Sequence, residues 1–148
     1  MTPTLFRIEL TLFSAAIFFL TGCSSGVTEV EDRSLQPCGS SPNCVSTQDV
    51  RDNFFLEPYV LTSEATMEKI TEAALSLPGA KLAEWKKNYA RFEYSSPILG
   101  FVDDLEVRIR DDQLIVRSES RVGYSDLGAN RNRAKRLREA LVEKNQID

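Results

Sequence analysis

The feature of this sequence that most constrains its fold is an alternation of apolar and charged residues on both sides of Asp111-Asp112. Residues 101–110 and 114–121 place apolar side chains at alternating positions, which is the pattern of a β-strand with one buried face. Two such segments joined by two polar residues predict an antiparallel hairpin. The rest of the chain must therefore supply a layer that covers the apolar face of this hairpin.

The pairing within this hairpin places charged residues opposite one another. A two-residue turn puts Glu106 directly across from Arg117, which is a favourable cross-strand pair. It also puts Asp104 across from Glu119, and this pair is unfavourable unless Arg117 or Arg121 bridges the two carboxylates diagonally. The other face of the hairpin is largely apolar and pairs Ile109 with Leu114, Val107 with Val116, and Leu105 with Ser118.

Helical periodicity flanks the predicted strands on both sides. The first helix is predicted to begin at Ser63, a good N-cap residue, and to end at Pro78-Gly79. The last helix is predicted from about Asn130, as its N-cap, to about Lys144. Its narrow apolar stripe consists of Ala134, Leu137 and Leu141.

The remaining segments complete a fold prediction. Residues 81–85 and 89–94 are predicted to be two further strands, and residues 54–61 are a candidate edge strand. This order of elements predicts the α+β class: a two-layer domain in which about four antiparallel strands pack against two helices, in the order helix, strands, helix.

The N-terminal part of the chain has the pattern of an export signal. Residues 10–20 form an apolar run that is shorter than the ~20 residues needed to cross a bilayer and that suits the core of a secretory signal. The next residues, Thr21-Gly22-Cys23, complete a string that resembles the lipobox of bacterial lipoproteins. This resemblance implies cleavage before Cys23, a diacylglycerol on its thiol and a further acyl chain, such as palmitate, on the new amino terminus. The alternative is an uncleaved signal anchor in which Cys23 has no role.

The lipobox resemblance assigns an address and an organisation to the chain. Two or three acyl chains make membrane attachment effectively permanent. Ser24 follows the cysteine, and by resemblance it favours the outer membrane, facing the periplasm, in a cell that has one. The chain is then predicted to consist of a signal peptide (residues 1–22), a flexible tether (residues 23–36) and one domain (residues 37–148). The alternative for the tether is an ordered arm packed on the domain.

The two remaining cysteines are Cys38 and Cys44. In an exported chain with Cys23 lipidated, they form an even pair, and an oxidising compartment favours a disulfide between them. A metal site is the alternative, but two thiols in a sequence without histidine make a poor one. The spacing is not that of Cys-x-x-Cys, so a redox role is weakly supported.

Three strings of this sequence carry a family resemblance. They are Cys38-Gly39-Ser40-Ser41-Pro42-Asn43-Cys44-Val45-Ser46, residues 100–108 and residues 117–133. Together they resemble the domain of unknown function 1499 family, which is found in bacterial envelope proteins and in some plastid proteins. The resemblance covers about residues 35–141 and implies a fold and an address, but no activity.

Basic residues crowd the first half of the last predicted helix, where cations oppose the helix dipole. They are Arg131, Arg133, Lys135, Arg136 and Arg138. The carboxylates of Asp103, Asp104 and Asp126 are available to compensate, and Gly123 and Gly128 allow the tight turns that could bring them close.

Three interpretations of this motif remain open. The first is a structural network of salt bridges that joins the hairpin to the helix. The second is a groove in which Arg121, Arg131 and backbone N–H groups near Asn130 bind a phosphate or carboxylate. The third is a metal-dependent or acidic-residue hydrolase, although neighbouring residues of a strand point to opposite faces. The hydrolase would use Asp103, Asp104 and Glu106. The candidate residues of the salt-bridge network and of the anion groove are the same set: Asp103, Asp104, Glu106, Arg117, Arg121, Asp126, Asn130, Arg131 and Arg133.

The function predicted from these features is that of a lipid-anchored envelope protein with a binding or scaffolding domain. Phospholipid headgroups, cell-wall polymers or an acidic peptide of a protein partner would supply the anionic ligand, and the membrane is a partner through the lipid on Cys23. The mildly acidic net charge of −4 gives no argument for nucleic acid. No cofactor or metal is predicted, and an enzyme is not favoured. The apolar loop at residues 97–101 is predicted to plug the core rather than to contact a membrane or a partner.

Overall fold

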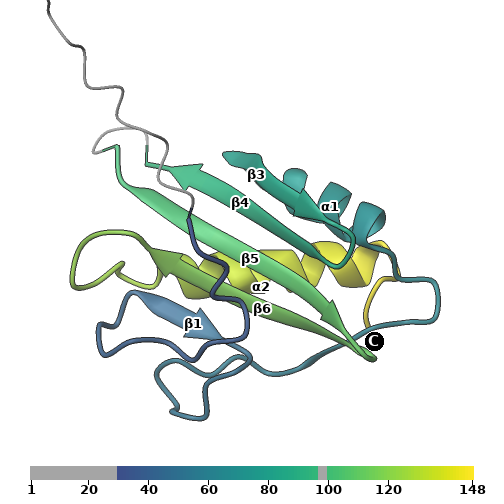
Figure 1. Ribbon diagram of the computed structural model, residues 1–148, viewed down its shortest axis with the longest axis horizontal. Coiled ribbons are helices and arrows are strands. Elements are labelled where there is room, and N and C mark those ends of the chain that lie inside the picture. Colours follow the sequence, from purple (N-terminus) through teal and green to yellow (C-terminus); the bar gives the residue numbers. More distant parts are fainter. Residues whose placement is uncertain (1–29, 97–99) are drawn as a thin grey trace, which may run out of the picture. The chain divides into compact units, whose positions relative to one another are not determined.

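The computed structural model describes residues 30–96 and 100–148 (Figure 1). The predicted signal peptide and Cys23 lie outside the described residues, as do residues 97–99 of the apolar loop. The helices are α1 (Met67–Leu75) and α2 (Ala129–Glu143). The strands are β1 (Cys44–Ser46), β2 (Tyr59–Val60), β3 (Ala80–Lys86), β4 (Tyr89–Ser95), β5 (Val102–Arg110) and β6 (Gln113–Ser120).

The sheet has six antiparallel strands, so the prediction of about four strands is wrong, although the α+β class holds. Strands β3, β4, β5 and β6 are neighbours in that order, and both β1 and β2 pair with the outer edge of β6. Strand β2 lies within residues 54–61, the candidate edge strand of the sequence analysis, although only two of those residues form it. With three residues, β1 is too short to show the alternation that identifies a strand in a sequence.

The central hairpin has the predicted register. The β5–β6 pairing aligns Glu106 with Arg117 and Asp104 with Glu119, and the turn residue Asp111 adopts a positive φ of 55°. Aspartate is one of the residue types that tolerate this left-handed conformation. The alternation of side chains therefore directs one set of residues of each strand to the helices and the other set to the opposite face.

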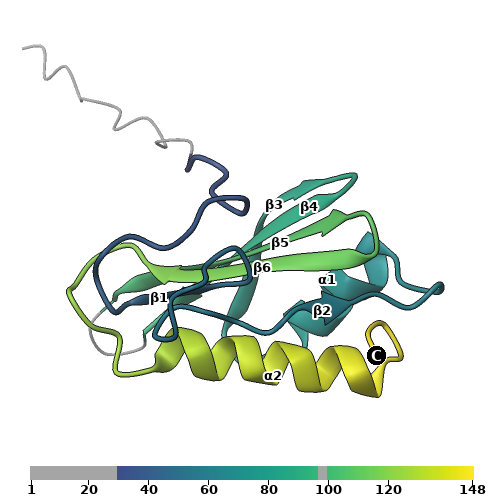
Figure 2. The same ribbon diagram turned by 90° about the horizontal axis from the view of Figure 1, so that it is seen from below.

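Both helices cover the same face of the sheet, and Figure 2 shows α2 lying along it. Period-2 residues of the strands and the apolar stripes of the helices meet in one core. Its fully buried side chains include Ile70, Phe92, Leu105, Val107, Leu114, Val116, Leu137 and Leu141. Within the described part of the chain, no helix has the length and apolar character required to cross a membrane.

Both helices begin at residues other than the predicted ones. Helix α1 begins four residues after Ser63, because the side chain of Thr66 accepts a hydrogen bond from the Lys69 backbone N–H and acts as its N-cap. Helix α2 has Gly128 as its N-cap, at φ 85°, and not Asn130. The Asn130 side chain is fully buried in the helix–sheet interface instead.

The segment before the disulfide is an ordered arm, so the predicted tether is wrong for its last residues. Asp32 forms an ion pair with Arg108, and the backbone N–H of Arg33 donates to Glu106 Oε1 at 2.8 Å. Ser34 is fully buried. The arm crosses the face of the sheet that lacks helices (Figure 2), and the compact unit of the chain begins at Glu31 rather than at residue 37.

The predicted disulfide between Cys38 and Cys44 is present, with a Cα–Cα distance of 5.8 Å. Phe54 packs against it, and the carboxylate of Asp49 accepts a hydrogen bond of 2.9 Å from the Cys38 backbone N–H. Because Cys44 is the first residue of β1, the bridge fastens the end of the arm to the edge of the sheet.

Candidate functional site

The predicted site residues lie on both faces of the sheet and do not form one site. On β5, Asp103 faces the helices, whereas Asp104 and Glu106 face the opposite side, as strand alternation requires. The three carboxylates of the hydrolase interpretation are therefore not brought together. Within residues 30–96 and 100–148, no group of three or more potential metal-ligating side chains occurs.

The face that lacks helices carries a network of ion pairs that we call the ion-pair cluster. Five of its members come from the hairpin, of which all but Glu119 were predicted site residues, and β4 adds two that the sequence did not indicate. The cluster consists of Arg91, Glu93, Asp104, Glu106, Arg117, Glu119 and Arg121.

Asp104 lies at the centre of the first half of the cluster. Arg91 Nη1 lies 3.0 Å from Asp104 Oδ1, and Arg121 Nε lies 2.7 Å from Asp104 Oδ2. The same two arginines bind Glu93 Oε1 at 2.9 Å and 2.5 Å. The Asp104 side chain is only 1% exposed, so its charge is balanced by arginines and not by water.

Glu106 occupies a less complete environment in the second half. Its Oε1 accepts from the Tyr89 hydroxyl at 3.0 Å and from the Arg33 backbone N–H. Its Oε2 is buried without a hydrogen-bond partner, and Arg117 Nη1 is 3.7 Å away. Arg117 instead donates to Glu119 at 2.8 Å.

These two environments shift the pKa values of the two carboxyls in opposite directions. Burial by itself raises the pKa of Asp104, but hydrogen bonds from Arg121 and Arg91 outweigh it and leave the pKa below its ordinary value. Burial also raises the pKa of Glu106, and there the Arg33 and Tyr89 hydrogen bonds and the charge of Arg117 offset it only in part. The pKa of Asp104 is thus lowered by its arginine partners, whereas burial leaves the pKa of Glu106 above its ordinary value.

The helix-facing residues form a second polar network around Asn130. Its Oδ1 accepts from the Ser118 hydroxyl at 2.7 Å, and its Nδ2 donates to the carbonyl of Asn43 at 2.9 Å. Arg133 donates to the same Oδ1 and to Asp103 Oδ2, the latter at 2.6 Å. These bonds fix the first turn of α2 to β6 and to the disulfide loop.

The proposed anion groove at the start of α2 is filled by a carboxylate of the chain itself. Asp126 Oδ1 accepts from the backbone N–H of Gly128 at 2.9 Å, and its Oδ2 accepts from that of Asn130 at 2.8 Å. Arg131 donates to the carbonyls of Asn53 and Phe55 instead of facing Arg121, which belongs to the ion-pair cluster. The predicted combination of Arg121, Arg131 and helix N–H groups does not exist.

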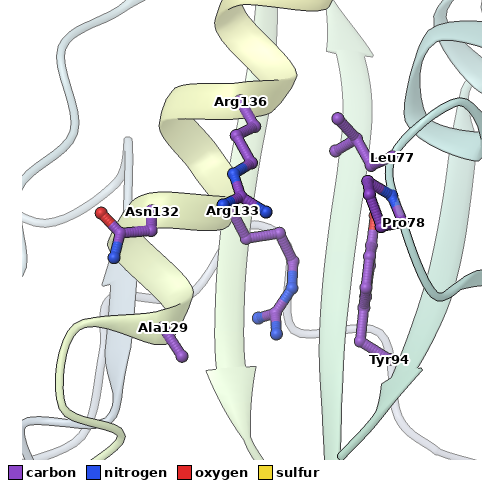
Figure 3. Close-up of a pocket in the computed structure, with 7 residues that line it drawn as sticks. All are labelled: Leu77, Pro78, Tyr94, Ala129, Asn132, Arg133 and Arg136. Carbon is purple, nitrogen blue, oxygen red and sulfur yellow. The ribbon is translucent and has the colours of Figure 1, made fainter.

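A pocket of about 270 Å³ lies between α2 and the turn that follows α1 (Figure 3). In Figure 3, Arg133 extends from α2 toward Leu77, Pro78 and Tyr94, which form the opposite wall, and the Arg136 side chain runs along α2 toward Arg133. The Arg133 guanidinium lies 4.4 Å from the centroid of the Tyr94 ring. Ala129 and Asn132 complete the lining, and we call this site the Arg136 pocket.

Arg136 differs from the other arginines of α2 in its partners. Arg131 and Arg138 donate to backbone carbonyls, and Arg133 is paired with Asp103. Arg136 is exposed and forms no ion pair or hydrogen bond with the described residues. The sequence places Arg136 one turn after Arg133, but the apolar wall opposite it comes from the α1–β3 turn and is not visible in local sequence.

Together these features define an α+β domain whose six-stranded sheet carries helices on one face and an ion-pair cluster on the other. Residues 34–141 match the family described as Protein of unknown function (DUF1499), so the chain belongs to that family, as its sequence motifs predicted. No curated protein and no solved structure matches the chain.

Proposed function

We propose that this protein is a lipid-anchored protein of the bacterial cell envelope whose domain binds an anionic envelope component in the Arg136 pocket. The observation that carries this proposal is the guanidinium of Arg136, which lies beside an apolar wall and has no ion-pair or hydrogen-bond partner among residues 30–96 and 100–148. Elsewhere on α2, the arginines already have acceptors within the chain.

The charge of the pocket supports an anionic ligand. The ion pair between Arg133 and Asp103 is neutral in sum, and the Arg133 guanidinium is further fixed by Asn130 and by the Tyr94 ring. The positive charge that remains for a ligand is therefore that of Arg136. A guanidinium binds phosphate or carboxylate through two parallel hydrogen bonds, and Pro78 and Leu77 provide contact for an apolar part of the ligand.

The address of the protein rests on its sequence. The apolar residues 10–20 followed by Thr21-Gly22-Cys23 support lipidation of Cys23, and Ser24 supports an outer-membrane location facing the periplasm. A protein at such a site meets phosphate groups of lipids and anionic polymers of the cell wall. Both present the chemistry that Arg136 would bind.

Binding can be tested with inorganic phosphate as the probe. We expect the backbone N–H resonances of Ala129, Asn132 and Arg133, which line the pocket, to move most during a phosphate titration at constant ionic strength, and we expect this response to disappear in Arg136→Gln. Arg110→Gln is the matched control, because Arg110 is exposed at the last position of β5, whereas Asp103, the partner of Arg133, lies near the start of that strand. An unchanged phosphate response in Arg136→Gln would contradict the proposed site.

Lipidation has an independent test. The intact mass of the protein extracted from membranes should correspond to a chain that begins at Cys23 and carries acyl groups. Cys23→Ser should abolish both processing and membrane retention. An unmodified Cys23 on a full-length, membrane-bound chain would contradict the proposed anchor.

A further inference from the structure

Four large apolar side chains are exposed together at one end of the sheet. Phe101 precedes β5, and Val122, Tyr124 and Leu127 belong to the loop between β6 and α2. Their exposed fractions are 48%, 55%, 76% and 95% respectively. The backbone of Arg121 donates to the carbonyl of Val102, which holds the two segments side by side. We call this set the apolar end, and its β6–α2 loop lies next to the start of α2 in Figure 2.

The apolar end surrounds a pocket of about 250 Å³. Phe101, Val122 and Leu127 contribute apolar lining, and Ala129 lines both this pocket and the Arg136 pocket. The two sites are therefore neighbours. The described part of the chain leaves the apolar end uncovered, which is uncommon for several large apolar side chains of one surface.

The conformation of Leu127 indicates that its exposure is built into the loop. Its φ is 52°, in the left-handed region that disfavours an apolar side chain with a Cβ. Hydrogen bonds hold it there, because its N–H donates to the Ser125 hydroxyl and the next residue donates to Asp126. A leucine held in a strained conformation and 95% exposed adds nothing to the packing of the domain, so its side chain is available for a contact from outside.

The charged groups beside the apolar end are already paired within the chain. Arg121 binds Asp104 and Glu93, Asp126 binds backbone N–H groups of α2, and Asp103 binds Arg133. The surface that remains is apolar, with the hydroxyl of Tyr124 as a polar tip. A tyrosine among aliphatic and aromatic side chains suits the boundary between water and lipid, where one part of the ring is dry and the other is wet.

The proposed anchor keeps a membrane within reach of this surface. Eight residue steps separate Cys23 from Glu31, the first residue of the compact unit, and span at most about 28 Å. A domain of this size has a radius of gyration of about 13 Å, so the maximum length of the tether is comparable to the diameter of the domain. Because the tether confines the domain near the bilayer, it raises the effective concentration of membrane at the apolar end. Even a weak apolar contact with the membrane then forms.

We propose that the apolar end docks on the lipid bilayer, with Leu127 and Val122 among the acyl chains and Tyr124 at the headgroup level. This proposal rests on the proposed lipid anchor at Cys23. It also identifies the ligand of the Arg136 pocket as the phosphate of a lipid headgroup, because docking brings the adjoining pocket to that level of the membrane.

The depth of the apolar end can be measured with a fluorescent probe. A probe on Val122→Cys, in the lipidated protein on phosphatidylglycerol-containing vesicles, should lose fluorescence when the lipids carry brominated acyl chains. The matched control is Val142→Cys on the far half of α2, which is also exposed and should keep its fluorescence. In the protein labelled at position 122, Leu127→Asp should abolish the quenching while the protein stays on the vesicles.

The results separate the docking from the anchor. Equal quenching at positions 122 and 142, or none at either, would overturn the docking. Shielding of position 122 in whole envelopes but not on pure lipid vesicles would overturn it in favour of a protein partner. If the intact mass shows no acyl group, a Cys23→Ser chain with an N-terminal hexahistidine tag is held on vesicles that contain a nickel-chelating lipid and measured in the same way. Quenching at position 122 then supports the docking although the proposed lipidation has failed.

Discussion

The ion-pair cluster and the Arg136 pocket use the same residue type in two different ways. In the cluster, Arg91 and Arg121 both contact Glu93 and Asp104, and Asp104 between them is almost completely buried. In the pocket, Arg136 faces open space beside Pro78 and Tyr94 without a carboxylate from the described residues. An arginine-rich motif is therefore not one site, because the partner of each guanidinium decides whether that arginine stabilises the fold or is available to a ligand.

The difference has an energetic consequence. A buried charge that loses its partner costs several kcal/mol, whereas an exposed charge that has no partner within the chain costs little to remove. Substitutions in the cluster should therefore affect folding. Substitutions at Arg136 should affect binding and leave folding unchanged.

The largest effect is expected from Asp104→Asn. This change leaves Arg91 and Arg121 without their shared buried carboxylate and should lower the free energy of unfolding by about 3–5 kcal/mol, measured by urea denaturation. Asp112→Asn, in the exposed hairpin turn, is the control and should change it by less than about 0.5 kcal/mol. Similar small effects from both variants would show that the cluster does not hold the sheet together.

An intermediate effect is expected from Arg133→Gln, at the boundary of the two regions. Asp103 loses its ion pair and Asn130 loses one donor, which should lower the free energy of unfolding by about 1–3 kcal/mol in the same measurement. A loss as large as that of Asp104→Asn would place Arg133 among the structural ion pairs and break the division between the regions.

The smallest expected effect is the pH dependence of the free energy of unfolding, which has opposite signs for Asp104 and Glu106. The Asp104 contribution is present above the ordinary pKa of 3.8 and is lost as the pH falls through its lowered folded value. The Glu106 contribution is present below its ordinary pKa of 4.5 and is lost as the pH rises through its raised folded value. Glu106→Gln should therefore gain stability relative to the wild type as the pH rises through that range.

The pH comparison is made by urea denaturation of Asp104→Asn, Glu106→Gln and the wild type between pH 3 and pH 7. The deficit of Asp104→Asn should grow as the pH rises, whereas that of Glu106→Gln should shrink or change sign. Differences that run in the same direction for both variants would contradict the opposite shifts of the two pKa values.

The sequence was sufficient for features that depend on local pattern. The alternation on both sides of Asp111-Asp112 predicted the hairpin register, and with it the pairing of Glu106 with Arg117. It was insufficient for contacts between elements that are distant in the chain. Arg91 joins Asp104 only because β4 lies beside β5, an arrangement that no local period encodes.

The predicted N-cap of the last helix was wrong because several side chains can satisfy the same backbone groups. Asn130 is a suitable N-cap residue, but Asp126 reaches the first N–H groups of α2 and releases the Asn130 side chain into the core. The predicted plug at residues 97–101 is partly outside the described residues, and its last residue, Phe101, is 48% exposed and not in the core. The composition of a loop does not reveal which neighbour covers it.

The division of roles between the two regions is tested most directly by thermal unfolding of the wild type, Arg121→Gln and Arg136→Gln, each with and without phosphate at equal ionic strength. We predict a lower midpoint for Arg121→Gln with the phosphate stabilisation retained. For Arg136→Gln we predict an unchanged midpoint and no stabilisation by phosphate. Loss of phosphate stabilisation in Arg121→Gln together with its retention in Arg136→Gln would contradict the account.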